Sequence, residues 1–499
     1  GNHPGNTSNV YIYCFVSERG LEPLRPCGHK HLKLARLPIS PPGLTRSPLY
    51  FTLKERAKLR QTRENISVSR ELIEDAIKIC QDLIRIPSVN FGEGKGDERA
   101  VAEYIVKSLS EVGIKSKIYE SAPDRCNVIA KLEGSDSLRP GLVLHGHIDV
   151  VPAAAEEWQV DPFSAVIKDG AIWGRGAVDM KNVDAMILAI VRHWARTGIK
   201  PPRNIVLAFF ADEEAGSTYG SRYMAKEHPE VFAGCNQAVS EVGGFSVTLS
   251  NGKRLYMIEA AQKGIHWVKL TARGQAGHGS FINNENAVSK LSEAVSKVGN
   301  YEWPQTYTKA VRELFAAIAD ALGRPLGDDY REFLIEIPSV ARMIAATLQN
   351  TANPTMLDAG YKANVIPKEA HAVIDGRFLP GYEEALNKTL AEIVGPEIKI
   401  ESITRDIALE VPFEGPLVDA MKAAIYKLDP EGIPVPYLMS GGTDNKALSE
   451  LGIVGYGFSP LRLPAELDFM ALFHGVDERI PLESLEFGVK ALEDFLLHS

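Results

Sequence analysis

The stretch LVLHGHIDVVP, residues 142–152, joins an apolar run to two histidines and an aspartate. Because side chains alternate across a strand, His145, His147 and Asp149 can share one face where the strand ends. Open α/β sheets place their ligand sites at this end of the strands. A histidine followed two residues later by a carboxylate suits a metal ligand with a partner that orients it. A pair of hydrogen-bonded core histidines explains this segment equally well.

Runs rich in β-branched residues alternate with helical patterns around this stretch. The composition predicts strands over residues 127–132, 141–147, 204–212 and 254–260. Apolar residues at helical spacing predict helices over residues 69–86, 99–114 and 183–198. Such alternation predicts an α/β fold built around a mainly parallel sheet.

A second, smaller domain is expected from residue 264 to residue 404. Its patterns follow the order β-α-β-β-α-β of a ferredoxin-like α+β domain, with a helical insertion at about 308–349. Helical and strand patterns of the first kind resume after residue 405, so residues 69–263 and 405–499 are expected to form one interrupted domain. Residues 1–68 contain many prolines and lack a clear period, which predicts a poorly ordered extension.

Composition excludes several classes of function. The net charge of -9 leaves no basic surface for a phosphate backbone, so nucleic acid is not an expected partner. The 5 cysteines contain no CxxC pair, which favours a reducing, cytoplasmic location. The longest apolar stretches, such as residues 204–211, fall short of the roughly 20 residues that cross a bilayer, so no membrane partner is expected.

Further acidic residues follow other predicted strands or turns. Asp179 lies at a Gly-rich turn that enters a helix, Glu213 and Glu214 end the strand before them, and Glu241 follows another apolar run. Taken singly, each has an ordinary explanation as a helix cap, a solvated turn or a surface carboxylate. Together they converge on one edge of the sheet. Carboxylates and imidazoles without cysteine favour zinc or a similar divalent ion, and a shared carboxylate allows two ions about 3.5–4 Å apart.

The motifs GHIDVVP, GRGAVDMK, ADEEAGS, SEVGG, GQAGHGS, DGRFLPG, GGTDNKAL and FHGVDER occur in this order. They resemble the M20 family of metallopeptidases and amidohydrolases, which includes succinyl-diaminopimelate desuccinylase, acetylornithine deacetylase, aminoacylase and several carboxypeptidases. The resemblance covers roughly residues 70–499. It implies a zinc-hydrolase catalytic domain interrupted by a lid or dimerisation domain.

The resemblance also implies a role for each residue of the metal site. His147 and Glu241 would bind one ion, Glu214 and His474 would bind the other, and Asp179 would bridge the two. Asp149 would orient His147, and Glu213 would act as general base. His145 would be a neighbour without a direct ligand role. The implied cofactors are two Zn²⁺ ions, for which Co²⁺ or Mn²⁺ can substitute.

Substrate handling is also assigned by resemblance. His278 would donate a hydrogen bond to the developing oxyanion, often across a dimer interface, although a lone loop histidine is ordinarily a surface residue. Arg377 would bind the substrate's α-carboxylate, with a structural ion pair to Asp375 as the alternative. Further pocket contacts would come from Asn364, Gly441, Gly442 and Thr443. A homodimer formed through the lid domain is therefore expected.

These residues predict a metal-dependent hydrolase that cleaves an amide or peptide bond next to a free carboxylate. The expected substrates are dipeptides, the C-termini of peptides, or N-acyl amino acids. A non-catalytic metal-binding protein of the same fold is the alternative, although such proteins are expected to lose a ligand or the base. A nucleotide-dependent enzyme and a serine hydrolase are not supported, since GxxxxGK[ST] and GxSxG are absent from the sequence.

Overall fold

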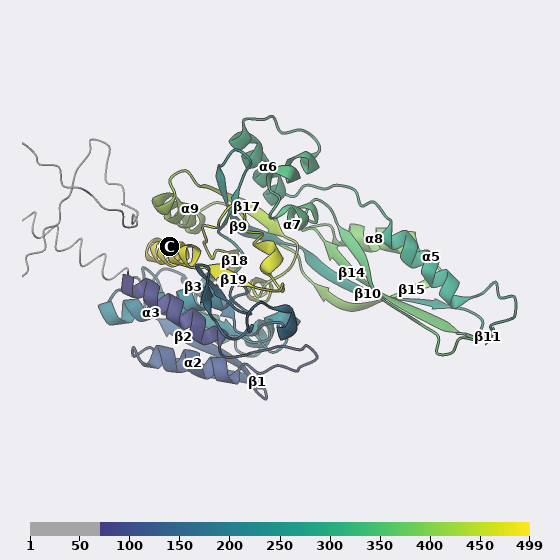
Figure 1. Ribbon diagram of the computed structural model, residues 1–499, viewed down its shortest axis with the longest axis horizontal. Coiled ribbons are helices and arrows are strands. Elements are labelled where there is room, and N and C mark those ends of the chain that lie inside the picture. Colours follow the sequence, from purple (N-terminus) through teal and green to yellow (C-terminus); the bar gives the residue numbers. More distant parts are fainter. Residues whose placement is uncertain (1–69) are drawn as a thin grey trace, which may run out of the picture. The chain divides into compact units, whose positions relative to one another are not determined.

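The computed structural model describes residues 70–499 (Figure 1). The expected N-terminal extension, residues 1–68, lies outside the described residues. The description begins with a helix over residues 70–84, where apolar spacing predicts one.

A ten-stranded sheet forms the centre of the fold. Its main path runs β1-β2-β6-β3-β7-β18-β9-β16, and both β8 and β17 also pair with β9. The neighbours β6, β3, β7 and β18 are parallel, whereas β1 and β2 add antiparallel partners at one side. The strands are β1 (Ser116–Ala122), β2 (Arg125–Leu132), β3 (Gly141–His147), β6 (Ile205–Phe210), β7 (Cys235–Ser240), β8 (Phe245–Thr248), β9 (Arg254–Gln262), β16 (Leu409–Glu410), β17 (Ile433–Met439) and β18 (Val454–Gly457).

Helices cover both faces of this sheet. Every residue of β3 and β6 is buried, as continuous apolar runs in parallel strands require. One face carries a core to which Leu72 and Leu496 both belong, so the two ends of the described chain share it. The other face packs Phe210 against Met224 and Leu448. The helices are α2 (Arg99–Ser110), α3 (Lys181–Thr197), α4 (Ser221–Glu227), α9 (Pro416–Leu428), α10 (Asn445–Ser449) and α11 (Leu482–His498).

A separate antiparallel sheet, in the order β12-β14-β10-β15, forms the smaller unit. Alternate residues of β14 are buried, and they face α5 and α8 in a core of their own. The order β10, α5, β12, β14, α8, β15 is β-α-β-β-α-β, which confirms the predicted ferredoxin-like arrangement. The elements are β10 (Gly264–Arg273), β11 (Gly277–His278), α5 (Ala287–Gly299), β12 (Thr351–Ala359), β13 (Val365–Ile366), β14 (Glu369–Phe378), α8 (Glu383–Val394) and β15 (Ile398–Asp406).

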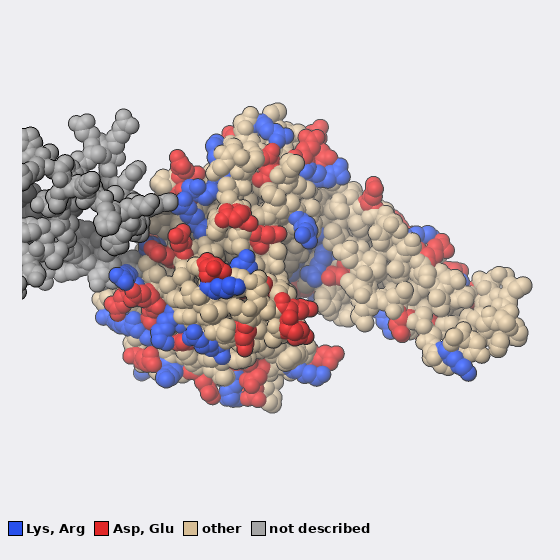
Figure 2. Space-filling model, in the orientation of Figure 1, with Lys and Arg blue, Asp and Glu red and all other residues tan. Residues whose placement is uncertain are grey.

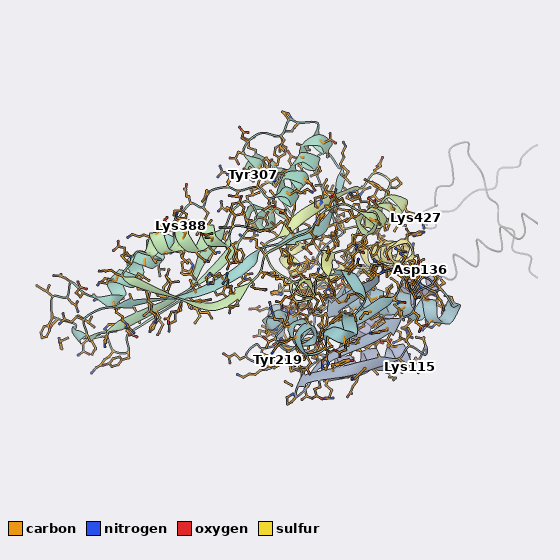
Figure 3. All side chains as sticks on the ribbon, turned by 180° about the vertical axis from the view of Figure 1, so that it is seen from behind. Lys115, Asp136, Tyr219, Tyr307, Lys388 and Lys427 are labelled. Atoms are coloured by element: carbon orange, nitrogen blue, oxygen red, sulfur yellow. The ribbon has the colours of Figure 1, made fainter. Side chains whose placement is uncertain are left out.

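The insertion consists of α6 (Lys309–Leu322), the 3₁₀ helix η4 (Tyr330–Glu336) and α7 (Ala341–Ala345). It interrupts the small domain in sequence, but α6 and α7 pack against β17 of the large sheet. Phe315 belongs to the large core and stacks near Tyr330, which itself stacks on Tyr307 at 3.9 Å between ring centroids. Figure 3 shows Tyr307 with this insertion and Lys388 on α8 of the small domain.

A small three-stranded sheet pairs the chain before Asp179 with the chain after His474. β5 (Ala171–Trp173) pairs with both β4 (Ile167–Lys168) and β19 (Arg479–Pro481). The remaining short helices are η1 (Ala155–Glu157), η2 (Glu213–Ala215), η3 (Pro229–Phe232) and η5 (Met470–Leu472). Between residues 70 and 499, no helix is long and apolar enough to cross a membrane. Figure 2 shows acidic and basic side chains interspersed on the visible face of the large unit.

Candidate metal centre and active site

The candidate ligands come from strand ends and the loops beside them. His147 is the last residue of β3, Glu214 lies in η2 directly after β6, and Glu241 directly follows β7. Because these three strands are parallel neighbours, their carboxyl ends meet at one edge of the sheet. Asp179 lies just before α3, and His474 lies between η5 and β19.

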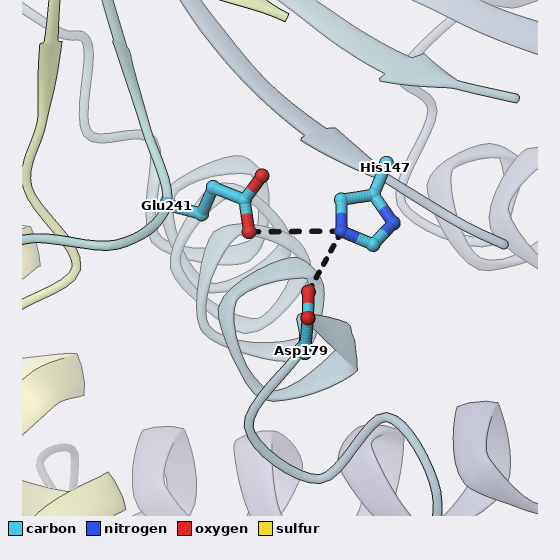
Figure 4. A group of neighbouring side chains, drawn as sticks. All are labelled: His147, Asp179 and Glu241. Atoms are coloured by element: carbon cyan, nitrogen blue, oxygen red, sulfur yellow. Dashed lines mark hydrogen bonds and ion pairs between the residues drawn. The ribbon is translucent and has the colours of Figure 1, made fainter. Parts of the chain in front are cut away.

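His147, Asp179 and Glu241 form the first group of potential ligands (Figure 4). The Nε2 atom of His147 lies 2.9 Å from Oδ1 of Asp179 and 3.6 Å from Oε2 of Glu241. All three residues are buried. One atom from each can therefore face a single small cation.

Asp179, Glu214 and His474 form the second group. The Nε2 atom of His474 lies 3.2 Å from Oδ2 of Asp179 and 2.9 Å from Oε2 of Glu214. The two oxygens of Asp179 thus face different histidines. This is the arrangement of a carboxylate that bridges two ions.

Burial and mutual proximity shift the pKa values of the acids and histidines in this centre. Burial raises the pKa of Glu214 to about 7, and burial also raises the pKa values of Glu213 and Glu241. Burial of the His147 ring opposes its charge, but neighbouring carboxylates, Glu241 foremost, outweigh burial and hold its pKa well above the usual value. Hydrogen bonds to Asp179 and Glu214 raise the pKa of His474 to about 10.

The donor set fits divalent cations. Both groups consist of imidazole nitrogens and carboxylate oxygens, a donor set that suits zinc and similar divalent ions. Oε1 of Glu214 is buried and has no hydrogen-bond partner among the described residues, so it is open to a ligand. Bound cations would offset the negative charges of the crowded carboxylates.

Asp149 connects His147 to the turn that carries two of the acids. Its carboxylate accepts backbone N–H bonds from Glu213 and Glu214, each at 3.1 Å, and a bond from the Asn90 amide at 2.8 Å. The Nδ1 atom of His147 lies 3.0 Å from the Asp149 carbonyl oxygen and 3.4 Å from its Oδ1. Asp149 therefore fixes the end of β3 against the turn after β6.

Glu213 faces the same space as the ligands. It lines the cavity described below, and its Oε2 lies 4.0 Å from Nε2 of His147. It belongs to neither three-residue ligand group. A carboxylate with a raised pKa, next to the ligands and facing a cavity, is placed to exchange protons with a bound molecule.

Glu478 positions the turn before Asp179, a role that the sequence analysis missed. Its buried carboxylate accepts backbone N–H bonds from Gly176, Val178 and Asp179 at 2.7 to 3.1 Å, and Arg175 donates to it at 2.7 Å. The residue lies within the FHGVDER motif, but an acid in a loop gives no sign of its partner. Only the fold brings residue 478 to the turn at 176–179.

A buried ionic triad supports the turn after β6, and the sequence analysis missed it too. Arg125 donates to Glu98 at 2.7 Å and to Asp212 at 2.8 Å. Asp212 adopts a left-handed conformation, with φ of 65°, directly before Glu213. Asn90 also donates to Asp212, at 3.0 Å. The triad thereby fixes the residue from which the Glu213 and Glu214 turn begins.

A cavity of about 430 Å³ opens onto the candidate ligands. Gly441 and Gly442 line it, as the resemblance implied for substrate contacts. Thr443 is not among the lining residues; it is buried behind them, where its Oγ1 accepts a bond from Gln262 at 2.8 Å. The insertion contributes Pro338, Ser339, Val340, Arg342 and Met343 to the lining.

Three other predicted substrate residues do not line this cavity. His278 is exposed and pairs with Val365 between β11 and β13. It follows β10, whose ten residues extend about 33 Å at roughly 3.3 Å a residue. Figure 1 shows β11 at the far end of the small domain. Asn364 is exposed beside it, and its carbonyl accepts a bond from Gly279.

Arg377 forms the ion pair that the sequence allowed as the alternative. Its Nε lies 2.7 Å from Oδ1 of Asp375, and a second bond of 3.1 Å completes a bidentate contact. Its guanidinium also lies 5.9 Å from the ring centroid of Trp267. Within this chain the cation is therefore already matched by a carboxylate.

His145 belongs to neither ligand group. Its Nε2 is 2.9 Å from Oδ1 of Asn445, and burial lowers its pKa to about 4. The ring is therefore neutral at physiological pH. It also packs near Phe210, with ring centroids 5.6 Å apart.

Comparison with known proteins identifies the family. Residues 143–498 match the model of peptidase family M20/M25/M40. A probable carboxypeptidase S-like 2 of Dictyostelium discoideum is 30% identical, over 73% of this chain and 71% of that protein. An N-fatty-acyl-amino acid synthase/hydrolase of Homo sapiens is 28% identical, over 86% of this chain and 88% of that protein.

The solved structures agree in fold. The crystal structure of an M20 family metallo-carboxypeptidase from Sulfolobus solfataricus superposes with a TM-score of 0.66 at 20% identity. The alignment covers 85% of this chain and 99% of that one. The match in fold therefore extends over both the large domain and the small domain.

Proposed function

The chain belongs to peptidase family M20/M25/M40 and is a hydrolase of amide bonds. On that premise we propose that it is a metal-dependent enzyme whose substrates carry a free carboxylate beside the scissile bond. These substrates are dipeptides, the C-termini of peptides, or N-acyl amino acids. The observation that supports the proposal best is the pair of ligand groups sharing Asp179, with Glu213 facing the cavity beside them.

The proposed cofactors are two Zn²⁺ ions, with Co²⁺ or Mn²⁺ as substitutes. His147 and Glu241 would hold one ion, Glu214 and His474 the other, and Asp179 both. Bound divalent cations supply Lewis acidity, which lowers the pKa of water and polarises an amide carbonyl.

Glu213 is the proposed general base. Its carboxylate accepts a proton from the water that attacks the carbonyl carbon, and later donates that proton to the leaving nitrogen as the C–N bond breaks. The products are a carboxylate and an amine. Asp149 would keep the turn of Glu213 in register with His147 through its bonds to the backbone of that turn.

A homodimer is the proposed assembly, because His278 does not line the cavity of its own chain. The edge strand β12 exposes Met356 and Leu357, an apolar surface suited to a second copy. In such a dimer His278 of the partner subunit would donate to the oxyanion. Asn364, Gly441, Gly442 and Thr443 remain proposed substrate contacts. Arg377 remains the residue that resemblance assigns to the substrate's carboxylate.

A reducing, cytoplasmic location is proposed as well. The cysteines among the described residues, Cys80, Cys126 and Cys235, form no disulfide. The alternative of a non-catalytic binding protein is disfavoured, because all five candidate ligands are present and meet in space, and Glu213 lines the cavity.

The test is a substrate screen combined with metal analysis. N-acetyl and N-succinyl amino acids and dipeptides are incubated with the protein in Zn²⁺ or Co²⁺, before and after chelation. Glu213→Gln should bind metal like the wild type and lose about 10²- to 10⁴-fold or more in turnover. His147→Ala and Asp179→Ala should lose metal as well as activity.

The matched control is Glu156→Gln, an exposed acid of η1 that should change neither property. Full turnover by Glu213→Gln would rule out the assigned base. Undiminished hydrolysis after complete metal removal would rule out the metal-dependent mechanism.

A further inference from the structure

Val242, which follows the candidate ligand Glu241, has an unusual backbone conformation. Its φ of 51° lies in the left-handed region. Among residues 70–499 it is the single β-branched residue with a positive φ. Two substituents on Cβ crowd the backbone in this region, so valine adopts it only where surrounding contacts impose it. The contacts around the turn of residues 241–244 therefore determine its shape.

Backbone contacts hold one side of this turn. The amide of Ser459 donates to the Gly243 carbonyl at 2.7 Å. A Cβ atom at Gly243 would overlap the carbonyl of Gly457, the last residue of β18, so the turn and the strand end meet backbone to backbone. Within the described part of the chain, no backbone N–H donates to the carbonyl of Val242.

A side chain binds the carbonyl of Val242 instead. The hydroxyl of Tyr437, on β17, donates to it at 2.5 Å. Tyr437 is 0% exposed and packs on Phe245, with ring centroids 5.9 Å apart, so its hydroxyl has a fixed position. A buried tyrosine hydroxyl ordinarily finds an acceptor, and this bond could serve that need alone. The acceptor, however, belongs to the strained residue that follows Glu241.

The turn carries a ligand of one group only. Glu241 belongs to the group with His147 and Asp179, and not to the group with Glu214 and His474. Its Oε2 lies 3.6 Å from Nε2 of His147, and its side chain is buried. A movement of the turn therefore displaces a ligand of one proposed ion and leaves the ligands of the other in place.

We propose that Tyr437 is a positioning residue for the metal centre: its hydroxyl holds Val242 in the left-handed conformation and thereby directs the Glu241 carboxylate toward one ion. The inference rests on the proposed function, because it concerns the metal centre named there. Without the hydroxyl bond, valine is free to relax toward a negative φ, and Glu241 moves with it. Glycine adopts a positive φ without strain, so Val242→Gly removes the need for this bond.

The experiment is a Co²⁺ titration of the metal-free protein, followed by the visible absorption of the bound ions. The variants are Tyr437→Phe, Val242→Gly and the two combined, with Glu241→Ala to identify the ion that Glu241 binds. Tyr456→Phe is the matched control, because the Tyr456 hydroxyl also donates to a carbonyl, that of Pro412 at 2.7 Å, and Tyr456 is buried and outside the cavity lining. Urea unfolding of the metal-free variants is measured in parallel.

Tyr437→Phe should raise the Kd of the ion that Glu241→Ala loses by about 10- to 100-fold, the usual effect of losing a group that orients a ligand. The Kd of the second ion should stay at the wild-type value. Tyr456→Phe should bind both ions as the wild type does, although both tyrosine variants lose one buried hydrogen bond and should unfold at similarly reduced urea concentrations. In the Val242→Gly background, Tyr437→Phe should leave both Kd values nearly unchanged.

Equal weakening of both ions in Tyr437→Phe would overturn the proposal, because a general loss of structure would explain it. A loss of equal size in the Val242→Gly background would overturn it too, since strain at residue 242 would then be irrelevant, and so would wild-type binding in Tyr437→Phe. Failure of the proposed function gives a different result, in which the wild type itself binds fewer than two Co²⁺ ions.

Discussion

The buried triad of Glu98, Arg125 and Asp212 provides the sharpest test of how the catalytic turn is held. The three side chains are 0%, 1% and 2% exposed, so neither carboxylate can turn to water if the guanidinium is removed. We predict that Arg125→Met destabilises the folded protein and misplaces Glu213. Methionine fills much of the arginine's apolar volume, so the loss reports the charge and its hydrogen bonds.

The magnitude follows from burial. Removing one partner of a buried ion pair costs about 3–5 kcal/mol, because the remaining charge is left uncompensated. That is a large part of the ~5–15 kcal/mol by which folded proteins are typically stable. A shift of about 1 Å in Glu213, through Asp212, would lower kcat about 10²-fold.

The assay is urea unfolding at neutral pH, in metal and in chelator, together with kcat on the best substrate. Arg99→Met is the matched control, since Arg99 also contacts two acids, Glu120 and Asp124, but on the surface. It should unfold at nearly the wild-type urea concentration, because exposed pairs contribute little. Wild-type stability and kcat in Arg125→Met would refute the view that the triad holds the turn.

Two further predictions concern buried acids. Glu478→Gln should weaken metal affinity about 10- to 100-fold, because the backbone N–H groups that place Asp179 lose an anionic acceptor. Competition with a chromophoric chelator measures the affinity, and Glu483→Gln, a change at an exposed acid, is the control. An unchanged metal affinity in Glu478→Gln would contradict the prediction. Burial raises the pKa of Glu259 to about 8 from an ordinary 4.5. The unfolded chain ionises this carboxyl group above about pH 4.5, whereas the folded protein keeps it protonated up to about pH 8. The free energy of unfolding therefore falls as the pH rises from about 4.5 to 8, by up to about 5 kcal/mol, and this group changes it no further above that range. Glu259→Gln should lack this fall in unfolding free energy between pH 5 and pH 9, and equal slopes in both proteins would show that Glu259 does not titrate in this range.

Local patterns determined the elements of the fold. The apolar run before His147 predicts the strand over residues 141–147, and β3 has these bounds. The apolar spacing over residues 183–198 predicts the helix found as α3, Lys181–Thr197. Both signals depend on residues close in sequence, since a strand repeats every two residues and a helix every 3.6. The β-α-β-β-α-β order follows in the same way.

Four candidate ligands could be nominated from sequence because each follows a predicted strand or turn, and parallel strands end at a common edge: His147, Asp179, Glu214 and Glu241. The fifth, His474, was assigned only by the family resemblance. Partners that lie far away in the chain carry no such signal. Glu478 reaches the turn of residues 176–179, and Arg125 reaches Asp212, only because the chain path brings them together. In sequence both look like ordinary charged residues.

The sequence by itself determined the strands and helices, the interrupted order of the two units, and which imidazoles and carboxylates lie at the strand ends. The tertiary structure alone decided that the insertion packs on the large sheet and lines the cavity with Arg342, while Arg377 is paired with Asp375. The physical reason is the sequence distance over which each effect acts. Periodicity and turn chemistry act between near neighbours, whereas burial and charge pairing depend on which distant segments the folded core places side by side.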